Sequence, residues 1–160
     1  MIDGLLFPLT LLSALGCGLI AGAFFAFSTF VMQALGRLPP PQGIAAMQSI
    51  NIVVINPWFL GVFLGTAVVC VLLAVSALLI WSEPAAIYLL VGSVLYFAGT
   101  FLVTMVFNVP LNKALAVADP ASAEGANLWS KYLVSWTAWN HLRAGAALIA
   151  MASFILAQLA

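Results

Sequence analysis

Four long apolar stretches constrain this chain more than any other feature of its sequence. They cover residues 5–36, 57–81, 85–108 and 128–159. About 20 residues of helix are enough to cross the ~30 Å of hydrocarbon in a bilayer, and each stretch reaches that length. Helices are expected because lipid offers no partner for a free backbone amide, and the stretches lack the alternating pattern of an outer-membrane strand. The sequence therefore predicts an all-α protein, a four-transmembrane-helix bundle formed by a single domain of residues 1–160.

The composition agrees with a chain that is surrounded by membrane lipid. Of its 160 residues, 66% are hydrophobic and 5% are charged, whereas a soluble globular domain has about 25% charged residues. Nucleic-acid binding is excluded, since four Lys and Arg residues are balanced by four Asp and Glu residues and form no basic stripe. The two cysteines, Cys17 and Cys70, offer neither a disulfide framework nor a CxxC redox pair. An integral membrane protein is expected.

Proline marks the breaks between the predicted helices. Residues 39–41 are three prolines that end the first helix, and residues 56–57 (Asn-Pro) begin the second. Residues 43–55 between them predict a short interfacial helix that lies at the membrane surface. The segment 108–110 (Asn-Val-Pro) is expected to end or kink the third helix. Residues 127–137, rich in Trp and Tyr, are expected to lead into the fourth helix at the interface.

All basic residues belong to one end of the bundle, which holds the connections between helices 1 and 2 and between helices 3 and 4. These residues are Arg37, Lys113, Lys131 and Arg143. The other end carries Asp3 and Glu83 but no Lys or Arg. The positive-inside rule then predicts both termini outside and the two longer loops in the cytoplasm, in a bacterial inner membrane.

Small residues recur every four residues along the first helix, at Ala14, Gly18, Gly22 and Ala26. Such rows allow membrane helices to approach closely. We interpret this row as a packing face within the bundle, and a homodimer interface is the alternative.

Polar and tryptophan side chains gather at the same end as the basic residues. In an up-down-up-down bundle, the end of helix 1, the start of helix 2, the end of helix 3 and the start of helix 4 meet there. Polar groups at membrane depth are costly, so a convergent set predicts a functional site. The residues expected to contact a substrate there are Gln33, Asn51, Asn56, Thr104, Asn112, Trp136 and Trp139.

Four residues of this end are candidates for chemistry: Asn108, Asn140, His141 and Arg143. Histidine changes charge near neutral pH, and His141 is the only histidine of the chain. At about 100° per residue, Asn140 and Arg143 share a helix face, whereas His141 lies about 160° from Arg143. His141 and Arg143 would therefore flank a cavity centred on Asn140. The alternatives are a packing role for the histidine, a membrane-surface role for the arginine, interhelical hydrogen bonds for the asparagines and an aromatic belt for the tryptophans.

No metal site is predicted, because one histidine and no carboxylate within a span cannot supply a ligand set in one subunit. Met32 and Met105 lie near the polar end, so a copper or haem site that pairs a methionine with His141 is the alternative. The sequence also lacks a Gly-rich phosphate loop and a Ser-centred nucleophile elbow, which makes ATP-driven work and Ser-based hydrolysis poor interpretations.

Four segments resemble the anthrone-oxygenase-like membrane proteins, a family long described as a domain of unknown function. They are residues 22–32 (GAFFAFSTFVM), 43–51 (GIAAMQSIN), 108–112 (NVPLN) and 136–143 (WTAWNHLR). The resemblance covers nearly the whole chain and implies a four-helix membrane fold. Fungal members of the family are linked to the oxidation of anthrones to anthraquinones.

The leading hypothesis is an oxygenase or oxidase whose hydrophobic phenolic or anthrone-like substrate enters from the lipid. His141 would act as the general base, and Arg143, Asn108 and Asn140 would donate hydrogen bonds to the enolate oxygen. The carbanion would reduce O₂ directly, so no cofactor is implied. Two alternatives stay open: a haem- or quinone-binding protein that uses His141, and a non-enzymatic membrane subunit whose polar end binds a partner protein.

Overall fold

The described part of the chain consists of helices joined by short loops. The computed structural model describes the backbone of residues 2–160 and the side chains of residues 4–160, and no strand occurs in that range. The α-helices are α1 (Ile2–Ala26), α2 (Met32–Gly36), α3 (Pro40–Val53), α4 (Pro57–Leu79), α5 (Ala85–Val94), α6 (Val109–Ala116) and α7 (Ala123–Leu159). Three π-helical segments, η1 (Phe27–Val31), η2 (Leu95–Leu102) and η3 (Thr104–Asn108), lie within the first and third long helices. The predicted all-α class is confirmed.

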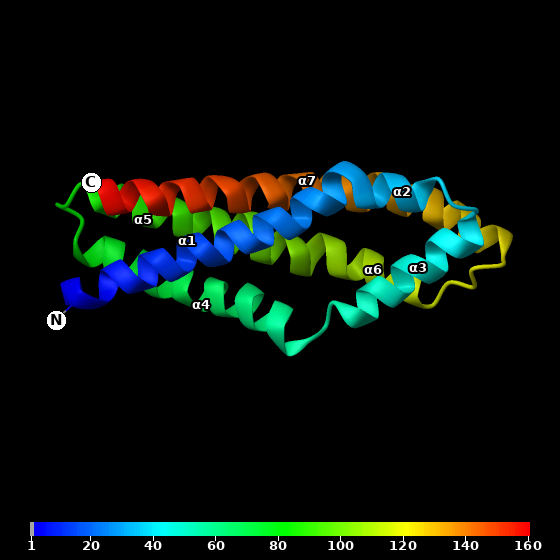
Figure 1. The fold of residues 1–160 in the computed structure, drawn as a ribbon, viewed down its shortest axis with the longest axis horizontal. Helices are drawn as coiled ribbons and strands as arrows, with labels where there is room; N and C mark the ends of the chain where they lie inside the picture. Colours follow the sequence, from blue (N-terminus) through cyan, green and yellow to red (C-terminus); the bar gives the residue numbers. More distant parts are fainter. Residues whose placement is uncertain (1) are drawn as a thin grey trace.

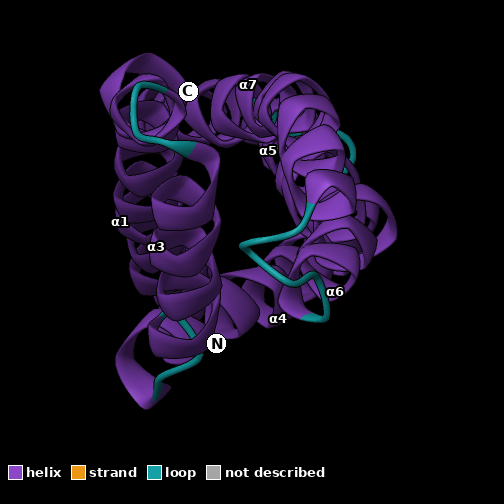
Figure 2. Cartoon of the chain, turned by 90° about the vertical axis from the view of Figure 1, so that its right-hand side faces the viewer, coloured by secondary structure: helices purple, strands orange, loops and turns teal. Residues whose placement is uncertain are grey.

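Four continuous helices are long and apolar enough to cross a membrane. They are Gly4–Gly36, Pro57–Leu79, Ala85–Ala116 and Ala123–Leu159. The helices run along one long axis, and both termini lie at the same end of the molecule (Figure 1). Viewed along that axis, α1 and α3 lie on one side of the bundle and α5, α6 and α7 on the other (Figure 2). The prediction of an integral membrane protein with four spans is therefore confirmed.

The third long helix extends farther than its sequence indicated, through Pro110 to Ala116. Proline has no N–H to donate and normally interrupts a helix. Here the turn before it is the π-helix η3, in which the N–H of Val109 donates to the carbonyl oxygen of Thr104, and Pro110 occupies the first turn of α6. Because a π turn changes the hydrogen-bond register, the helix continues past the proline.

The interior is divided into two layers along the axis. One layer lies between α1, α4, α5 and α7 and holds the two free cysteines, Cys17 and Cys70. The other layer is rich in aromatic side chains and includes Ile44 and Met47 of α3. The expected short helix is thus present as α3; it meets α4 at a bend and packs against α2, α6 and α7 (Figure 1). At 1.5 Å per residue, the 37 residues of α7 extend about 55 Å, so this helix passes through both layers.

Close contact between α1 and α4 depends on the absence of a side chain at Gly16. A Cβ atom built there would overlap Thr66 Oγ1 and lie 3.2 Å from Thr66 Cβ, whereas a Cβ atom at Gly22 meets nothing within 4 Å. We expect Gly16→Ala to lower the free energy of unfolding by about 1–3 kcal/mol, the usual cost of overpacking. Gly22→Ala, the matched control on the same helix, is expected to be neutral or to stabilise by up to about 1 kcal/mol through helix propensity.

Thermal unfolding of both variants in one detergent, followed by circular dichroism, measures this difference. A Gly16→Ala variant that melts at or above the temperature of Gly22→Ala would contradict the close packing of α1 on α4.

Candidate active site

Arg143 is the centre of a buried polar cluster at the junction of the two layers. Its side chain is only 5% exposed. Nε donates to Asn140 Oδ1 at 2.9 Å, and Nη1 donates to Thr104 Oγ1 at 3.2 Å. The guanidinium carbon lies 3.8 Å from the ring centre of Phe24 and 4.9 Å from that of Trp136. The cation is therefore held by neutral hydrogen-bond acceptors and by aromatic faces.

Asn140 connects this cation to the first helix. Its Nδ2 donates to the carbonyl oxygen of Phe24 at 2.7 Å and to Ser28 Oγ at 2.7 Å. Ser28 belongs to the π segment η1, which directly follows α1. Because Asn140 accepts from Arg143 and donates to Ser28, one amide links the buried cation to the hydroxyl group of the neighbouring helix.

The third helix contributes a row of polar side chains to the same cluster. Thr100 Oγ1 donates to the carbonyl oxygen of Arg143 at 3.1 Å, and Asn108 Nδ2 donates to that of Trp136 at 3.2 Å. Asn108 is fully buried, and its Oδ1 has no hydrogen-bond partner among the described residues. The π segments η2 and η3 include Thr100, Thr104 and Asn108, so their register brings these side chains onto α7.

Asn112 organises the aromatic side chains of the second layer. Its Oδ1 accepts from the Tyr132 hydroxyl at 2.8 Å and from Trp136 Nε1 at 2.8 Å. The rings of Trp129, Tyr132 and Trp136 stack in sequence, with centroids 5.6 and 6.0 Å apart. Two residues expected to contact a substrate, Asn112 and Trp136, are therefore hydrogen-bonded to each other.

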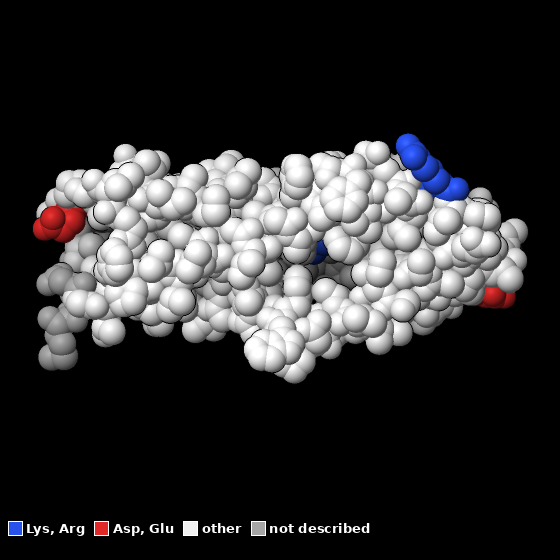
Figure 3. All heavy atoms as spheres, in the orientation of Figure 1, with Lys and Arg blue, Asp and Glu red and all other residues white. Residues whose placement is uncertain are grey.

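The surface is hollowed near the middle of the molecule, and a Lys or Arg atom is visible at the bottom of the hollow (Figure 3). All Lys and Arg residues lie in the described part of the chain, and Arg143 is the buried one among them. The hollow therefore opens onto a basic side chain.

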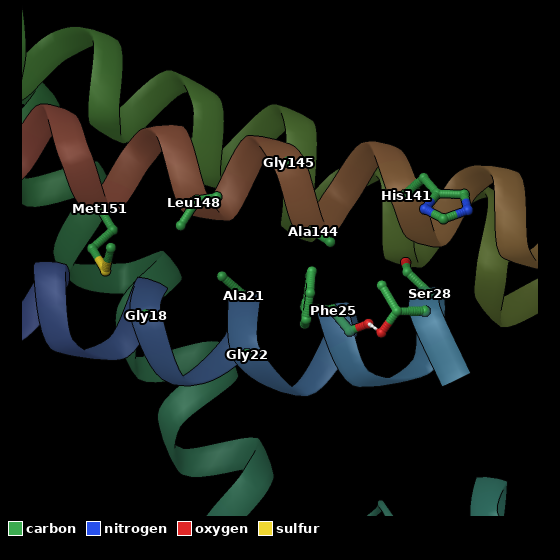
Figure 4. A pocket seen from close by; sticks show the side chains of 11 residues that line it. Gly18, Ala21, Gly22, Phe25, Ser28, His141, Ala144, Gly145, Leu148 and Met151 are labelled. Atoms are coloured by element: carbon green, nitrogen blue, oxygen red, sulfur yellow. Dashed lines mark hydrogen bonds between the residues drawn. The ribbon is translucent and has the colours of Figure 1, made fainter. Parts of the chain in front are cut away.

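His141 lies outside that cluster, on the exposed side of α7. Its side chain lines a groove of about 370 Å³ between α1 and α7, at the end where Ser28 also lies, with Met151 at the other end (Figure 4). It also lines a second groove of about 470 Å³, which includes Gln33, Arg37 and Thr137. Arg143 lines neither groove, and between the two residues the side chain of Asn140 bonds to α1.

Ser28 was not predicted as a site residue, although it connects the Arg143 cluster to the two grooves. It lines both grooves and accepts the hydrogen bond from Asn140. Gln33 was the residue of the first helix expected to contact a substrate. The π segment η1 changes the register there, so Ser28 is the residue that faces α7. The only sequence signal was a lone serine within an apolar and aromatic run.

The remaining predicted substrate contacts are dispersed. Gln33 is exposed and lines the second groove, and Trp139 stacks on Phe107 with centroids 3.7 Å apart. Asn56 caps α4, since its Oδ1 accepts from the N–H groups of Trp58 and Phe59. Asn51 is half-buried, and its Nδ2 has no partner among the described residues. These residues do not form one pocket with Arg143.

No group of three or more His, Cys, Asp or Glu side chains that could hold a metal ion occurs among the described residues. A resident metal would therefore need ligands of another kind, such as methionine or backbone oxygen.

The fold and the site define a class: a helical membrane protein with four spans, an internal arginine held by neutral partners, and a histidine in an outer groove. A family model described as "Anthrone oxygenase" matches residues 58–153, which is more than half of the chain. The chain belongs to the anthrone oxygenase family. Comparison with curated proteins and with solved structures gave no match.

Proposed function

We propose that this protein is a membrane-embedded oxygenase that oxidises a hydrophobic phenolic or anthrone-like substrate with O₂ in the groove between α1 and α7. The observation that carries the proposal is the position of His141. This base lies in an apolar groove beside Ser28, and Ser28 is hydrogen-bonded through Asn140 to Arg143. Membership of the anthrone oxygenase family supports oxygenase chemistry.

The groove suits a flat apolar ligand that arrives from the lipid. Its walls are mainly apolar, with Phe25, Leu148 and Met151 among them. Its glycines, Gly22 and Gly145, have open space where a side chain would be. The volume of about 370 Å³ is within the roughly 300–1,000 Å³ of small-molecule sites.

The first chemical step is the removal of a proton from carbon. His141 takes the proton from the substrate carbon between two aromatic rings, and the electron pair moves onto the carbonyl oxygen as an enolate. Ser28 Oγ accepts from Asn140, so its own hydroxyl proton is available for the enolate oxygen. Arg143 polarises this donor through Asn140, which stabilises the developing negative charge.

The carbanion then reduces O₂ and forms a carbon–oxygen bond, which gives a hydroperoxide once the histidine returns its proton. Loss of the second C–H proton with cleavage of the O–O bond yields the quinone carbonyl and one water. Overall, one CH₂ group and one O₂ become one C=O group and one H₂O. The substrate supplies all four electrons, so we propose that no redox cofactor takes part.

Oxygen consumption by the purified protein in nanodiscs, with anthrone as substrate, tests this function. We expect one O₂ consumed per quinone formed, above the rate in empty nanodiscs, and a rate that a metal chelator does not change. Ser28→Ala is expected to lower kcat by about 10²-fold, as the loss of an oxyanion donor does. Ser130→Ala, an exposed serine on α7, is the matched control and should retain activity.

Two results would count against the proposal. A rate equal to that of empty nanodiscs would remove anthrone oxidation as the function. Equal activities of Ser28→Ala and Ser130→Ala would show that Ser28 does not stabilise the enolate.

A further inference from the structure

The Arg143 cluster has features that the proposed chemistry in the groove leaves unused. Neither groove includes Arg143 or Asn108 in its lining. We propose that the interior beside Arg143 is a separate binding site for an aromatic carboxylate, and that the hollow of Figure 3 is its entrance. This inference does not rest on the proposed oxygenase function.

The first reason is the unmatched charge of Arg143. The residues that contact its guanidinium are an asparagine, a threonine and two aromatic rings, all of them neutral. A buried cation without a counter-charge is costly. A guanidinium has five N–H donors. The hydrogen bonds from Nε to Asn140 and from Nη1 to Thr104 leave the other N–H groups for a ligand. A bound anion would remove the imbalance.

The second reason is that another polar atom of this interior is also unsatisfied. Asn108 Oδ1 is buried without a hydrogen-bond partner among the described residues. Asn108 follows Thr104 along the same side of the third helix and binds the backbone of Trp136, whose ring lies over Arg143. Buried polar groups in native proteins are nearly always paired, so unpaired ones call for a ligand or bound water.

The chemistry of the walls identifies the ligand. Phe24 contacts the guanidinium and also lies 6.5 Å, centroid to centroid, from both Phe59 and Phe63, so the apolar surroundings are aromatic. A carboxylate is ionised at neutral pH, whereas a phenol is not, and its two oxygens match the guanidinium fork. An aryl carboxylate combines both requirements.

The position of the hollow agrees with an amphiphilic ligand. α4 begins in the middle of the molecule, beside the hollow (Figures 1 and 3). Its first turn carries Trp58, which is 87% exposed. Exposed tryptophans at the ends of membrane helices mark the boundary between lipid and water. A ligand with an apolar ring and a charged group concentrates at this boundary.

The test uses 2-naphthoate binding to the protein in phosphatidylcholine nanodiscs, measured by ligand fluorescence. Thr104→Asp places a carboxylate where Thr104 Oγ1 now accepts from Arg143, and Thr104→Asn has nearly the same shape without charge. We expect Thr104→Asp to weaken 2-naphthoate binding by about tenfold or more, and Thr104→Asn to change it by less than about threefold. Thr104→Asp is expected to melt no lower than Thr104→Asn, because it supplies the missing counter-charge.

The unmodified protein gives an independent measurement that needs no variant. We expect 2-naphthoate to bind and the uncharged 2-naphthamide and the non-aromatic decanoate to bind at least about tenfold more weakly. Equal binding of the amide, equal binding of decanoate, or 2-naphthoate binding that Thr104→Asp leaves unchanged would overturn the proposal. Because the readout is binding, failure here is distinguishable from failure of anthrone oxidation in the groove.

Discussion

Replacing His141 with alanine is expected to lower the rate of anthrone-dependent O₂ consumption by about 10²- to 10⁴-fold, the contribution typical of a general base. In the proposed mechanism, His141 alone takes the proton from carbon, and the other groups near it in the groove, Ser28 and Thr29, are hydroxyls. The side chain is exposed, so its removal costs little packing and the melting temperature should stay unchanged. Steady-state oxygen uptake and thermal unfolding, measured on the same preparation, check both parts.

The open position of His141 allows a sharper control for this variant. Because the groove is accessible, added imidazole should enter the space left in His141→Ala and restore part of the rate. His141→Gln keeps a polar side chain of similar size but has no basic nitrogen, so it should be inactive and should not respond to imidazole. Normal turnover by either variant would show that His141 is not the base.

Replacing Asn140 with leucine is expected to lower the free energy of unfolding by about 3 kcal/mol or more. The substitution removes the acceptor of Arg143 Nε and the donor to the backbone oxygen of Phe24 and to Ser28 Oγ. Each buried polar group left without a partner costs about 1–3 kcal/mol, and a charged one costs more. Thermal or denaturant unfolding in a fixed detergent measures the loss.

Asn127 provides the matched control for that substitution. It lies on the same helix, α7, but its side chain is exposed. Asn127→Leu should therefore change stability by no more than about 0.5 kcal/mol. If the two leucine variants have the same free energy of unfolding, the hydrogen bonds of Asn140 do not stabilise the bundle.

Much of the fold could be predicted because membrane helices follow simple length and hydropathy rules. The four spans and α3 were visible in the apolar stretches and in the prolines between them. The angular spacing on α7 also indicated that Asn140 and Arg143 share a face, and they are hydrogen-bonded to each other. The same spacing put His141 on nearly the opposite side from Arg143, where it lies.

The separation of the polar residues into the buried Arg143 cluster and the outer grooves lined by His141 could not be predicted. Spacing along one helix does not tell whether a neighbouring helix fills the space between two side chains, and here Asn140 bonds directly to α1. The role of Ser28 depends on the π segment η1, for which the sequence carries no reliable signal. Asn56 was placed correctly at the start of the second span, and its amide caps α4, which its pairing with Pro57 alone did not indicate.

The π segments of the third span make the number of residues in it as important as their identity. Asn112 follows both η2 and η3, and it must meet Tyr132 and Trp136 on α7. Losing one residue within the regular α-helical turns of Ala85–Val94 would turn everything after it by about 100° and carry Asn112 away from both partners. The number of residues between Ala85 and Asn112 is fixed by the pairings at the far end of this helix. A single-codon deletion there would be more damaging than most substitutions in the same segment.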